Sequence, residues 1–459
     1  MAEATQTTPA PAPKFYTVNA QERSPAAGAK PKTVEFTVQA DDYKIAWQLA
    51  RLVTRVGTAS AKGKAIPAWA DKGRTTRLVM DPGEFSVQDV TSQQERAKKS
   101  VAVGLTDLVT RAKAQGIAIQ THNPRPGLWP EGDAVSLSPS PEIERAVADS
   151  FTDDTPSHDI DTRAIVVVHK GRIVAERYAD GFGPGTPQLG WSMSKSVTAS
   201  LIGTLIAAGE LKLDDPAPVP EWTVSGDPRH KITVRNLLNM SSGLAFKEPY
   251  DPGSDSTAML FQSHDMAGYA ATRPLAHPPG MFWSYSSGTA NIASRIVLTK
   301  SGGTLRSLED YAQTHLFGPL GMTSAVFEPD ESGNFVGSSY LYASARDWAR
   351  FGLFVLNDGT VAGRRLLPEG YVHFLCTPAP AATLHGYGGM FWLNGLDPKG
   401  GRWFPHLPTD YCAAEGHNDE FVSIFPSRHT VIVRLGWTGD AFRFDRDKHF
   451  GAILAALPR

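Results

Sequence analysis

Short apolar segments bounded by polar or turn-forming residues predict strands near both ends of the range 128–459. Ala164–Val168 and Ile173–Tyr178 flank the polar segment His169–Arg172, a pattern typical of a β-hairpin. Further segments with strand or helix patterns follow toward the C-terminus: the strands Gly389–Leu393, Phe421–Phe425 and Thr430–Arg434 and the helix Asp447–Leu457. Strands at both ends with helices between them indicate one sheet built from both ends of this range, interrupted by a helical insert at about 213–350.

The N-terminal part of the chain has a different texture and carries no recognisable chemistry. Residues 1–32 are rich in Pro, Ala and Thr, which predicts a disordered tail. Residues 33–127 predict an N-terminal extension that begins with a short strand, Val34–Val38. Helical spacing of apolar residues then predicts two helices, one from Asp41 and one that starts at a capping box opened by Ser92.

The chain has 459 residues and an ordinary composition, so it is long enough for a globular protein of two or three domains. The formal net charge of -2 argues against a general affinity for nucleic acid or anionic membranes. The two cysteines, Cys376 and Cys412, are expected to be buried free thiols, with a disulfide as the less favoured alternative.

The sequence also bears on location. It contains no apolar run long enough to span a bilayer. Met1–Ala12 lacks the apolar core of a signal peptide, which favours a cytoplasmic location. The alternative is a periplasmic or secreted protein from which the signal peptide was removed.

Ser192 and Lys195 form the one Ser-x-x-Lys pair in the chain, where a turn becomes an apolar helix. Residues i and i+3 share a helix face, so the lysine comes within reach of the serine hydroxyl. Burial of the lysine would lower its pKa toward that of a base active at neutral pH, and the helix N-terminus offers N–H groups to an oxyanion. Ser194 is a rival nucleophile, but its i+3 neighbour is Val197, which is no base.

With this pair, residues 128–459 resemble the serine β-lactamase-like hydrolases. This family includes class C β-lactamases, D,D-peptidases, related esterases and 6-aminohexanoate-dimer hydrolase, and the last of these resembles the chain most in pattern. Three further segments carry the resemblance: Ile232–Leu244, Leu316–Met322 and Tyr342–Phe351. It implies an α/β fold in which an antiparallel sheet is flanked by helices, with an all-helical domain beside it and the active site between them.

The resemblance extends to a tyrosine on a loop of the helical domain. Pro278–Ser287 is similar to the family segment that carries it, with Tyr285 at the tyrosine position. A phenol near an ammonium group can pass a proton to the leaving group. Classical β-lactamases have Tyr-x-Asn here, whereas this chain has Tyr285, Ser286 and Ser287, as in the dimer hydrolase. The departure weakens the expectation of antibiotic hydrolysis.

Four more residues are substrate-binding or oxyanion candidates by resemblance. His417 is the nearest equivalent of the basic residue in the family's third motif, and Asn418 is the candidate if the register shifts by one. Tyr250 is similar to a dimer hydrolase tyrosine that closes over the scissile amide. Asp265 is similar to an aspartate of that enzyme that receives the substrate's ammonium. If Asp265, Asp419 and Glu420 line the pocket, their negative charges predict that it repels a carboxylate group on the substrate.

The resemblance implies a serine hydrolase that cleaves an amide or ester through an acyl-enzyme on Ser192, without a metal or organic cofactor. The expected substrate is a small linear amide or ester, similar to a 6-aminohexanoate oligomer. The alternatives are a β-lactamase or D,D-peptidase acting on peptidoglycan-like substrates, or a penicillin-binding sensor without turnover. A homodimer is the expected assembly, and neither nucleic acid nor a membrane is expected as a partner.

Overall fold

The chain forms two compact units, Met1–Ile119 and Gln120–Arg459, in a computed structural model. The structure describes residues 125–137, 139–152, 160–250, 253–439 and 443–458. In the N-terminal unit it describes the backbone of four strands: β1 (Lys14–Gln21), β2 (Thr33–Ala40), β3 (Phe85–Asp89) and β4 (Ala102–Val103).

The N-terminal strands form one sheet in the order β3-β1-β2-β4. The strand expected at Val34–Val38 is confirmed as β2. The expectation of a disordered tail is wrong for β1, where Tyr16, Val18 and Ala20 alternate with polar residues, a pattern typical of a strand. β4 lies within the helix expected after Ser92, which is therefore also wrong there. The helix expected from Asp41 lies outside the described residues.

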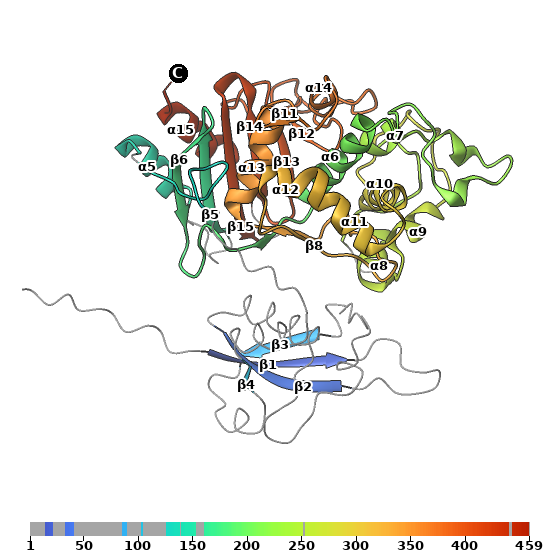
Figure 1. The fold of residues 1–459 in the computed structure, drawn as a ribbon, viewed down its shortest axis with the longest axis horizontal. Helices are drawn as coiled ribbons and strands as arrows, with labels where there is room; N and C mark the ends of the chain where they lie inside the picture. Colours follow the sequence, from blue (N-terminus) through green and yellow to red (C-terminus); the bar gives the residue numbers. More distant parts are fainter. Residues whose placement is uncertain are drawn as a thin grey trace, which may run out of the picture. The chain divides into compact units, whose positions relative to one another are not determined.

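The Gln120–Arg459 unit is built on a six-stranded antiparallel sheet (Figure 1). Its strands, in spatial order, are β12 (Trp392–Leu393), β13 (Cys412–Gly416), β14 (Glu420–Phe425), β15 (Thr430–Thr438), β5 (Ile160–His169) and β6 (Arg172–Tyr178). β15 pairs with β5 from Thr430↔His169 onward, so the two ends of the unit meet in the middle of the sheet. The expected hairpin and the expected sheet built from both ends are therefore confirmed.

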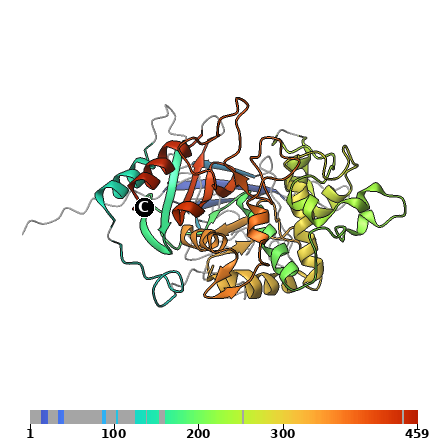
Figure 2. The same cartoon turned by 90° about the horizontal axis from the view of Figure 1, so that it is seen from above.

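Helices cover both faces of this sheet because both faces of its central strands are apolar. Alternate residues of β5 enter two separate cores, with Val166 in one and Val167 in the other. The helices α5 (Pro141–Asp149) and α15 (Arg446–Ala456) pack side by side over one face (Figure 2). The opposite core includes residues of two other helices: α6 (Met193–Ala207) and α13 (Ala345–Leu356).

An all-helical region lies beside α6, as expected for the insert. Its helices are α7 (Val234–Leu238), α8 (Asp255–Gln262), α9 (Met266–Ala271), α10 (Ser287–Lys300), α11 (Leu305–Ala312) and α12 (Gly318–Leu320). The region also contains the helical turns η1 (Pro220–Trp222), η2 (Pro228–Lys231) and η3 (Gln313–Phe317), whereas a fourth turn, η4 (Pro426–Arg428), joins β14 to β15. α10 packs against α6, and this contact brings the start of α10 to the Ser-x-x-Lys pair.

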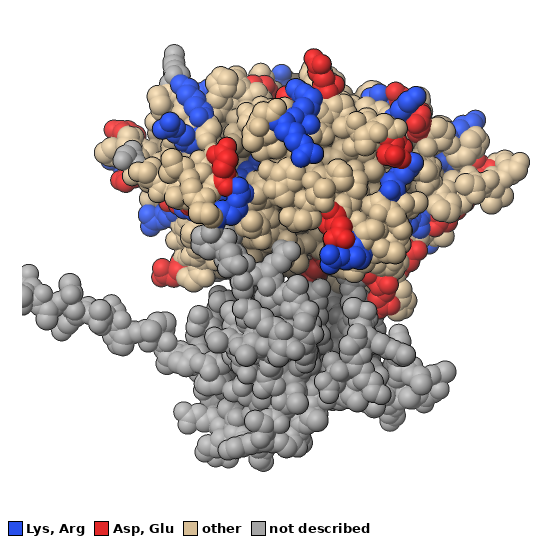
Figure 3. Space-filling view, viewed as in Figure 1, with Lys and Arg blue, Asp and Glu red and all other residues tan. Residues whose placement is uncertain are grey.

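Small elements complete the unit. A three-stranded sheet has the order β7 (Gln188–Leu189), β9 (Leu341–Ala343) and β8 (Val326–Phe327). Its strand β7 directly precedes α6 in the sequence. β10 (Thr360–Val361) pairs with β11 (Arg364–Arg365), and α14 (Tyr371–Leu375) follows them. On the face of this unit drawn in Figure 3, acidic and basic side chains are interspersed. No helix among the described residues is both long and apolar enough to cross a bilayer.

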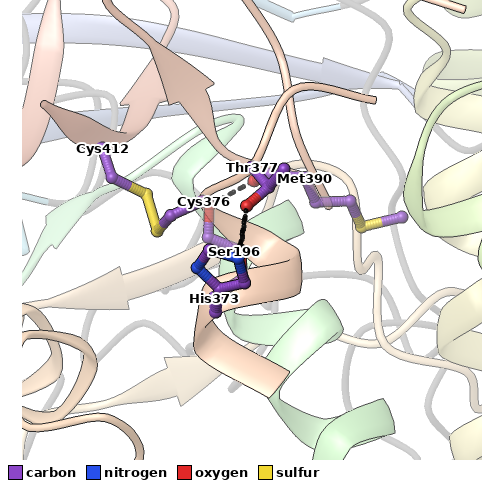
Figure 4. The surroundings of a disulfide bond; sticks show 6 residues. All are labelled: Ser196, His373, Cys376, Thr377, Met390 and Cys412. Carbon is purple, nitrogen blue, oxygen red and sulfur yellow. Dashed lines mark hydrogen bonds between the residues drawn. A yellow bond between two sulfur atoms is a disulfide. The ribbon is translucent and has the colours of Figure 1, made fainter. Parts of the chain in front are cut away.

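Cys376 and Cys412 form a disulfide, so the expectation of free thiols is wrong (Figure 4). The bond joins the C-terminal cap of α14 to the first residue of β13, with 5.6 Å between the two Cα atoms. Ser196 of α6 lies in the same region and donates a hydrogen bond to the carbonyl of Met390 at 2.6 Å. The disulfide therefore ties α14 to a strand that flanks the Ser-x-x-Lys pair.

Candidate active site

Ser192 stands at the N-cap of α6, and its hydroxyl makes no capping hydrogen bond. The turn before it is tight: Trp191 has a left-handed backbone with φ 42°. Gly190 is required there, because a Cβ atom would lie 2.3 Å from Cζ2 of Trp348. The turn therefore presents the serine hydroxyl without using it for the helix cap.

Lys195 is 1% exposed and its Nζ atom contacts three oxygen atoms. These are Ser192 Oγ at 2.9 Å, Ser287 Oγ at 3.1 Å and the carbonyl oxygen of Ser338 at 2.9 Å. Burial lowers the pKa of Lys195 to about 8, although the carboxylate of Glu248 opposes part of this shift. The structure thus brings the predicted nucleophile and base together, with a lysine that is partly neutral near pH 7.

Tyr285 lies against the same lysine, with Nζ 4.7 Å from the centre of its ring. Burial raises the pKa of its phenol well above 10, and nearby Tyr387 and Glu248 raise it further, while a hydrogen bond with Ser192 acts in the opposite sense. The ring packs between Tyr387 and Trp392, at centroid distances of 5.8 and 5.4 Å. Tyr285 is therefore a neutral phenol within hydrogen-bonding reach of the serine.

Glu248 and Ser287 complete the site, and sequence reasoning missed both as functional residues. Glu248 accepts hydrogen bonds from the backbone N–H of Ser287 at 2.7 Å and from its hydroxyl at 2.6 Å. Burial raises the pKa of the Glu248 carboxyl, and Lys195 and Ser287 lower it in part. Two spacings in the sequence could have pointed to these residues. Ser287 follows Tyr285 by two residues, and Glu248 precedes Tyr250 by two residues.

Tyr250 and His417 lie next to each other at the same site. The pKa of the Tyr250 phenol is raised by burial and by Glu248, and hydrogen bonds with the hydroxyls of Ser287 and Ser192 oppose that shift. Its ring is 5.4 Å from that of His417, which also lies 5.6 Å from the ring of Trp191. The structure therefore brings both predicted residues to the site.

His417 reaches the site because β13 runs close to the serine turn. A Cβ atom on Gly416 would lie 2.5 Å from the carbonyl oxygen of Gly190. Unlike the His417 side chain, which contacts the rings of Trp191 and Tyr250, the side-chain amide of Asn418 donates to the carbonyl of Thr438 at 2.7 Å. Its backbone is left-handed, with φ 67°, which is typical of a turn residue. The Asn418 side chain therefore holds the β13–β14 turn onto β15.

Asp265 is held away from the site. Its carboxylate caps α9, accepting from the N–H of Gly268 at 2.7 Å, and lies 3.7 Å from Arg295. Arg295 follows Ser287 by eight residues on α10, which places it about 12 Å along the helix. In the structure the carboxylate of Asp265 serves the helix cap and the ion pair, and its expected role as a partner for a substrate ammonium stays a prediction.

The acidic pair after Asn418 is also committed to structure. Asp419 accepts from the backbone N–H of Phe444 at 2.7 Å. Burial raises the pKa of Glu420 well above its usual value, against the opposing effect of Arg163 and Arg434. The expectation that these acids repel a substrate carboxylate loses its basis. Within the described residues, no group of three or more His, Cys, Asp or Glu side chains is arranged to hold a metal ion.

Comparisons with known proteins identify the family that the chain matches. A model of the family described as Beta-lactamase matches residues 143–454. The chain is 26% identical over 319 residues to a 6-aminohexanoate-dimer hydrolase from Paenarthrobacter ureafaciens, covering 64% of this chain and 75% of that protein. It is 30% identical over 189 residues to penicillin-binding protein 4 from Amycolatopsis lactamdurans, covering 40% and 46% of the two chains.

Solved structures agree on the fold. A candidate 6-aminohexanoate-dimer hydrolase from Bacillus anthracis superposes with a TM-score of 0.55 at 23% identity. The superposition covers 69% of this chain and 85% of that one. At this level of identity the likeness shows the fold alone, and it confirms the expected arrangement of an antiparallel sheet with flanking helices.

Proposed function

The chain belongs to the beta-lactamase family, and we propose that it cleaves a small linear amide or ester through an acyl-enzyme on Ser192. The family and the relatives matched here are serine hydrolases, and this chain is an enzyme of that kind. The observation that carries the proposal is the contact of 2.9 Å between Nζ of a buried Lys195 and Oγ of Ser192. A serine hydroxyl needs such a base to become a nucleophile.

In the proposed reaction, neutral Lys195 accepts the hydroxyl proton as Ser192 Oγ bonds to the substrate carbonyl carbon. The N–H of Ser192 and a backbone N–H near His417 are the proposed donors to the oxyanion. The C–N or C–O bond to the leaving group then breaks, and the leaving group takes the proton from Lys195 through the Tyr285 phenol. Water next attacks the ester carbonyl carbon and gives a proton to Lys195. The bond from that carbon to Ser192 Oγ then breaks, the acid product leaves, and Lys195 returns the proton to Oγ.

Lys195, rather than Tyr285, is the proposed base. The pKa of Lys195 is lowered to about 8, so a useful fraction is neutral near pH 7. The pKa of Tyr285 is raised well above 10, so its phenolate is scarce at that pH. A neutral phenol can still donate a proton while it accepts one, which suits Tyr285 to the transfer toward the leaving group.

We expect kcat/KM for a neutral ester to fall as the pH drops below about 8, the pKa of Lys195. Only the neutral amine can accept the serine proton, and its fraction falls about tenfold per pH unit below the pKa. The measurement is a pH–rate profile with a substrate that does not titrate. A limb centred near the ordinary lysine value of about 10.4 would contradict the proposed environment of Lys195.

The substrate class is tested by a panel of p-nitrophenyl esters, linear amides that include the 6-aminohexanoate dimer, and β-lactams. The match to the dimer hydrolase and the serine at position 287 support turnover of linear amides or esters. The second candidate is a β-lactamase or D,D-peptidase, which the likeness to penicillin-binding protein 4 favours. Rapid turnover of nitrocefin would favour that candidate, whereas a stable adduct without turnover would indicate a sensor.

The Cys376–Cys412 disulfide supports a periplasmic or secreted location over the expected cytoplasmic one. Disulfides are rare in cytoplasmic proteins because thiol reductants keep cysteines reduced there. In protein extracted from its native cells, we expect both cysteines to react with an alkylating reagent only after reduction. Complete alkylation without a reductant would favour the cytoplasm.

A further inference from the structure

We propose that Glu248, acting through the hydroxyl of Ser287, aims the lone pair of Lys195 at Ser192 and is a positioning residue for acyl transfer. The inference rests on the proposed function, because it concerns the base that activates Ser192. Glu248 itself has no place among the bonds that form and break in the reaction. Its two hydrogen bonds both go to Ser287, which in turn contacts Lys195.

With Glu248 ionised, the donors and acceptors of Ser287 leave one arrangement, in which Tyr250 can only donate to the Ser287 hydroxyl oxygen. An ionised carboxylate can only accept hydrogen bonds. Ser287 therefore gives its N–H and its hydroxyl hydrogen to Glu248, at 2.7 and 2.6 Å. The hydroxyl has no second hydrogen, so at 3.1 Å its oxygen can only accept from Nζ of Lys195.

The same accounting fixes the neutral lysine. A neutral amine has two N–H groups and one lone pair. Two of the three oxygen atoms that Nζ contacts have no hydrogen to give it, so each of these two must accept one of its N–H groups. These are Ser287 Oγ at 3.1 Å and the carbonyl oxygen of Ser338 at 2.9 Å. The lone pair is left for the third contact, Ser192 Oγ at 2.9 Å, where it can receive the proton. Without Glu248, the Ser287 hydroxyl could turn its hydrogen to that lone pair and compete with Ser192.

Glu248 also has a purely structural role that the test must separate. Ser286 caps α10, so Ser287 is the first helical residue and its N–H has no partner within the helix. A carboxylate at this end satisfies that N–H and interacts favourably with the helix dipole. A cap of this kind would affect stability but would not act on Lys195 through the serine hydroxyl.

The charge of Glu248 has an effect on pH dependence that a structural role alone would lack. Glu248 raises the pKa of Lys195, against the larger effect of burial. The other titratable groups around the pair are the phenols of Tyr250, Tyr285 and Tyr387, whose pKa values are raised above 10, and the His417 imidazole beside Tyr250. Removing the carboxylate charge should therefore let Lys195 stay neutral at lower pH.

The test is Glu248→Gln, which keeps the shape but replaces one acceptor oxygen with an NH₂ donor. Either the N–H or the hydroxyl of Ser287 then faces a donor, so the arrangement above is lost. We expect kcat to fall by about tenfold to a hundredfold, less than the roughly hundredfold to ten-thousandfold contribution of a general base because Lys195 itself is kept, with KM little changed. The acidic limb of the kcat/KM profile should move to lower pH. Glu248→Asp, which keeps the charge, should leave the limb near its wild-type position.

A matched control removes a carboxylate charge elsewhere. Glu210 is exposed, lies 3.7 Å from Lys300 and follows the C-terminal end of α6, whereas Ser192 and Lys195 are at the N-terminal end of that helix. Glu210→Gln should leave both kcat and the pH limb unchanged. Thermal unfolding of all variants reports separately on the loss of the α10 cap.

A double-mutant cycle with Ser287→Ala decides whether Glu248 acts through the serine hydroxyl. We expect Glu248→Gln to cost little further kcat in the Ser287→Ala background, because the route to Lys195 is already broken. Equal losses in both backgrounds, or an unshifted pH limb in Glu248→Gln, would overturn the inference. Wild-type protein whose Ser192 is never phosphonylated by a fluorophosphonate would instead overturn the proposed function, so the two failures are distinguishable. If Glu248→Gln does not fold, the cycle is run with Glu248→Asp, for which additive losses would again overturn the inference.

Discussion

Replacing Ser192 with alanine is expected to lower kcat by about a thousandfold or more, because loss of a covalent nucleophile removes the whole acyl-enzyme route. The serine is positioned for this role alone, since its hydroxyl contacts Lys195 Nζ at 2.9 Å and makes no helix cap. Its removal should leave the fold intact. The measurement is steady-state turnover of a p-nitrophenyl ester by wild-type and Ser192→Ala protein.

Ser194 provides the matched control for this prediction. It is fully buried, and its Oγ atom accepts a hydrogen bond from the backbone N–H of Leu341 at 3.1 Å. No base lies beside it on the helix, because its i+3 neighbour is Val197. Ser194→Ala should therefore keep acylation at Ser192, with a loss confined mainly to stability. A Ser192→Ala variant that turns over ester at nearly the wild-type rate would contradict the assignment.

Lys195→Arg is expected to be nearly inactive, with a loss in kcat of about a hundredfold to ten-thousandfold. Guanidinium stays protonated at every accessible pH, so it cannot accept the serine proton. The loss should not recover at high pH, whereas wild-type activity rises through about pH 8, the pKa of Lys195. Measuring kcat over about pH 6 to 11, a range that includes both the lowered pKa of about 8 and the ordinary lysine pKa of about 10.4, distinguishes the two behaviours.

Lys300→Arg is the control for that substitution. Lys300 is the last residue of α10 and pairs with Glu210 near the surface, at 3.7 Å. The same change there keeps a positive charge and should leave turnover unchanged. An active Lys195→Arg variant with a preserved acidic limb would exclude Lys195 as the base and return the role to Tyr285.

Local patterns predicted those parts of the fold that depend on neighbours in sequence. The apolar run of β5, which is buried on both faces, and the polar turn after it were enough to predict the β5–β6 hairpin, although β6 itself is only partly buried. Helical spacing placed Lys195 beside Ser192, because three residues of α6 determine that distance. β13 was missed as a strand, because Cys412–Gly416 is short and lacks alternation.

Features that depend on distant segments were missed or misjudged. Glu248 reaches Ser287 across 39 residues, and only the docking of its loop onto the start of α10 brings them together. The cysteines of the disulfide are 36 residues apart in sequence, on a helix cap and a strand. Asp265 was assigned to the substrate by resemblance, and that role stays a prediction, since capping of α9 and the ion pair with Arg295 decide where its carboxylate lies.

Mass spectrometry of the enzyme trapped with a slowly hydrolysed ester tests the acyl-enzyme most directly. The account predicts a single acyl adduct on the wild-type protein, mapped by peptide digestion to Ser192, and no adduct on Ser192→Ala. Turnover of the ester without any covalent adduct, or an adduct mapped to Ser194, would contradict it.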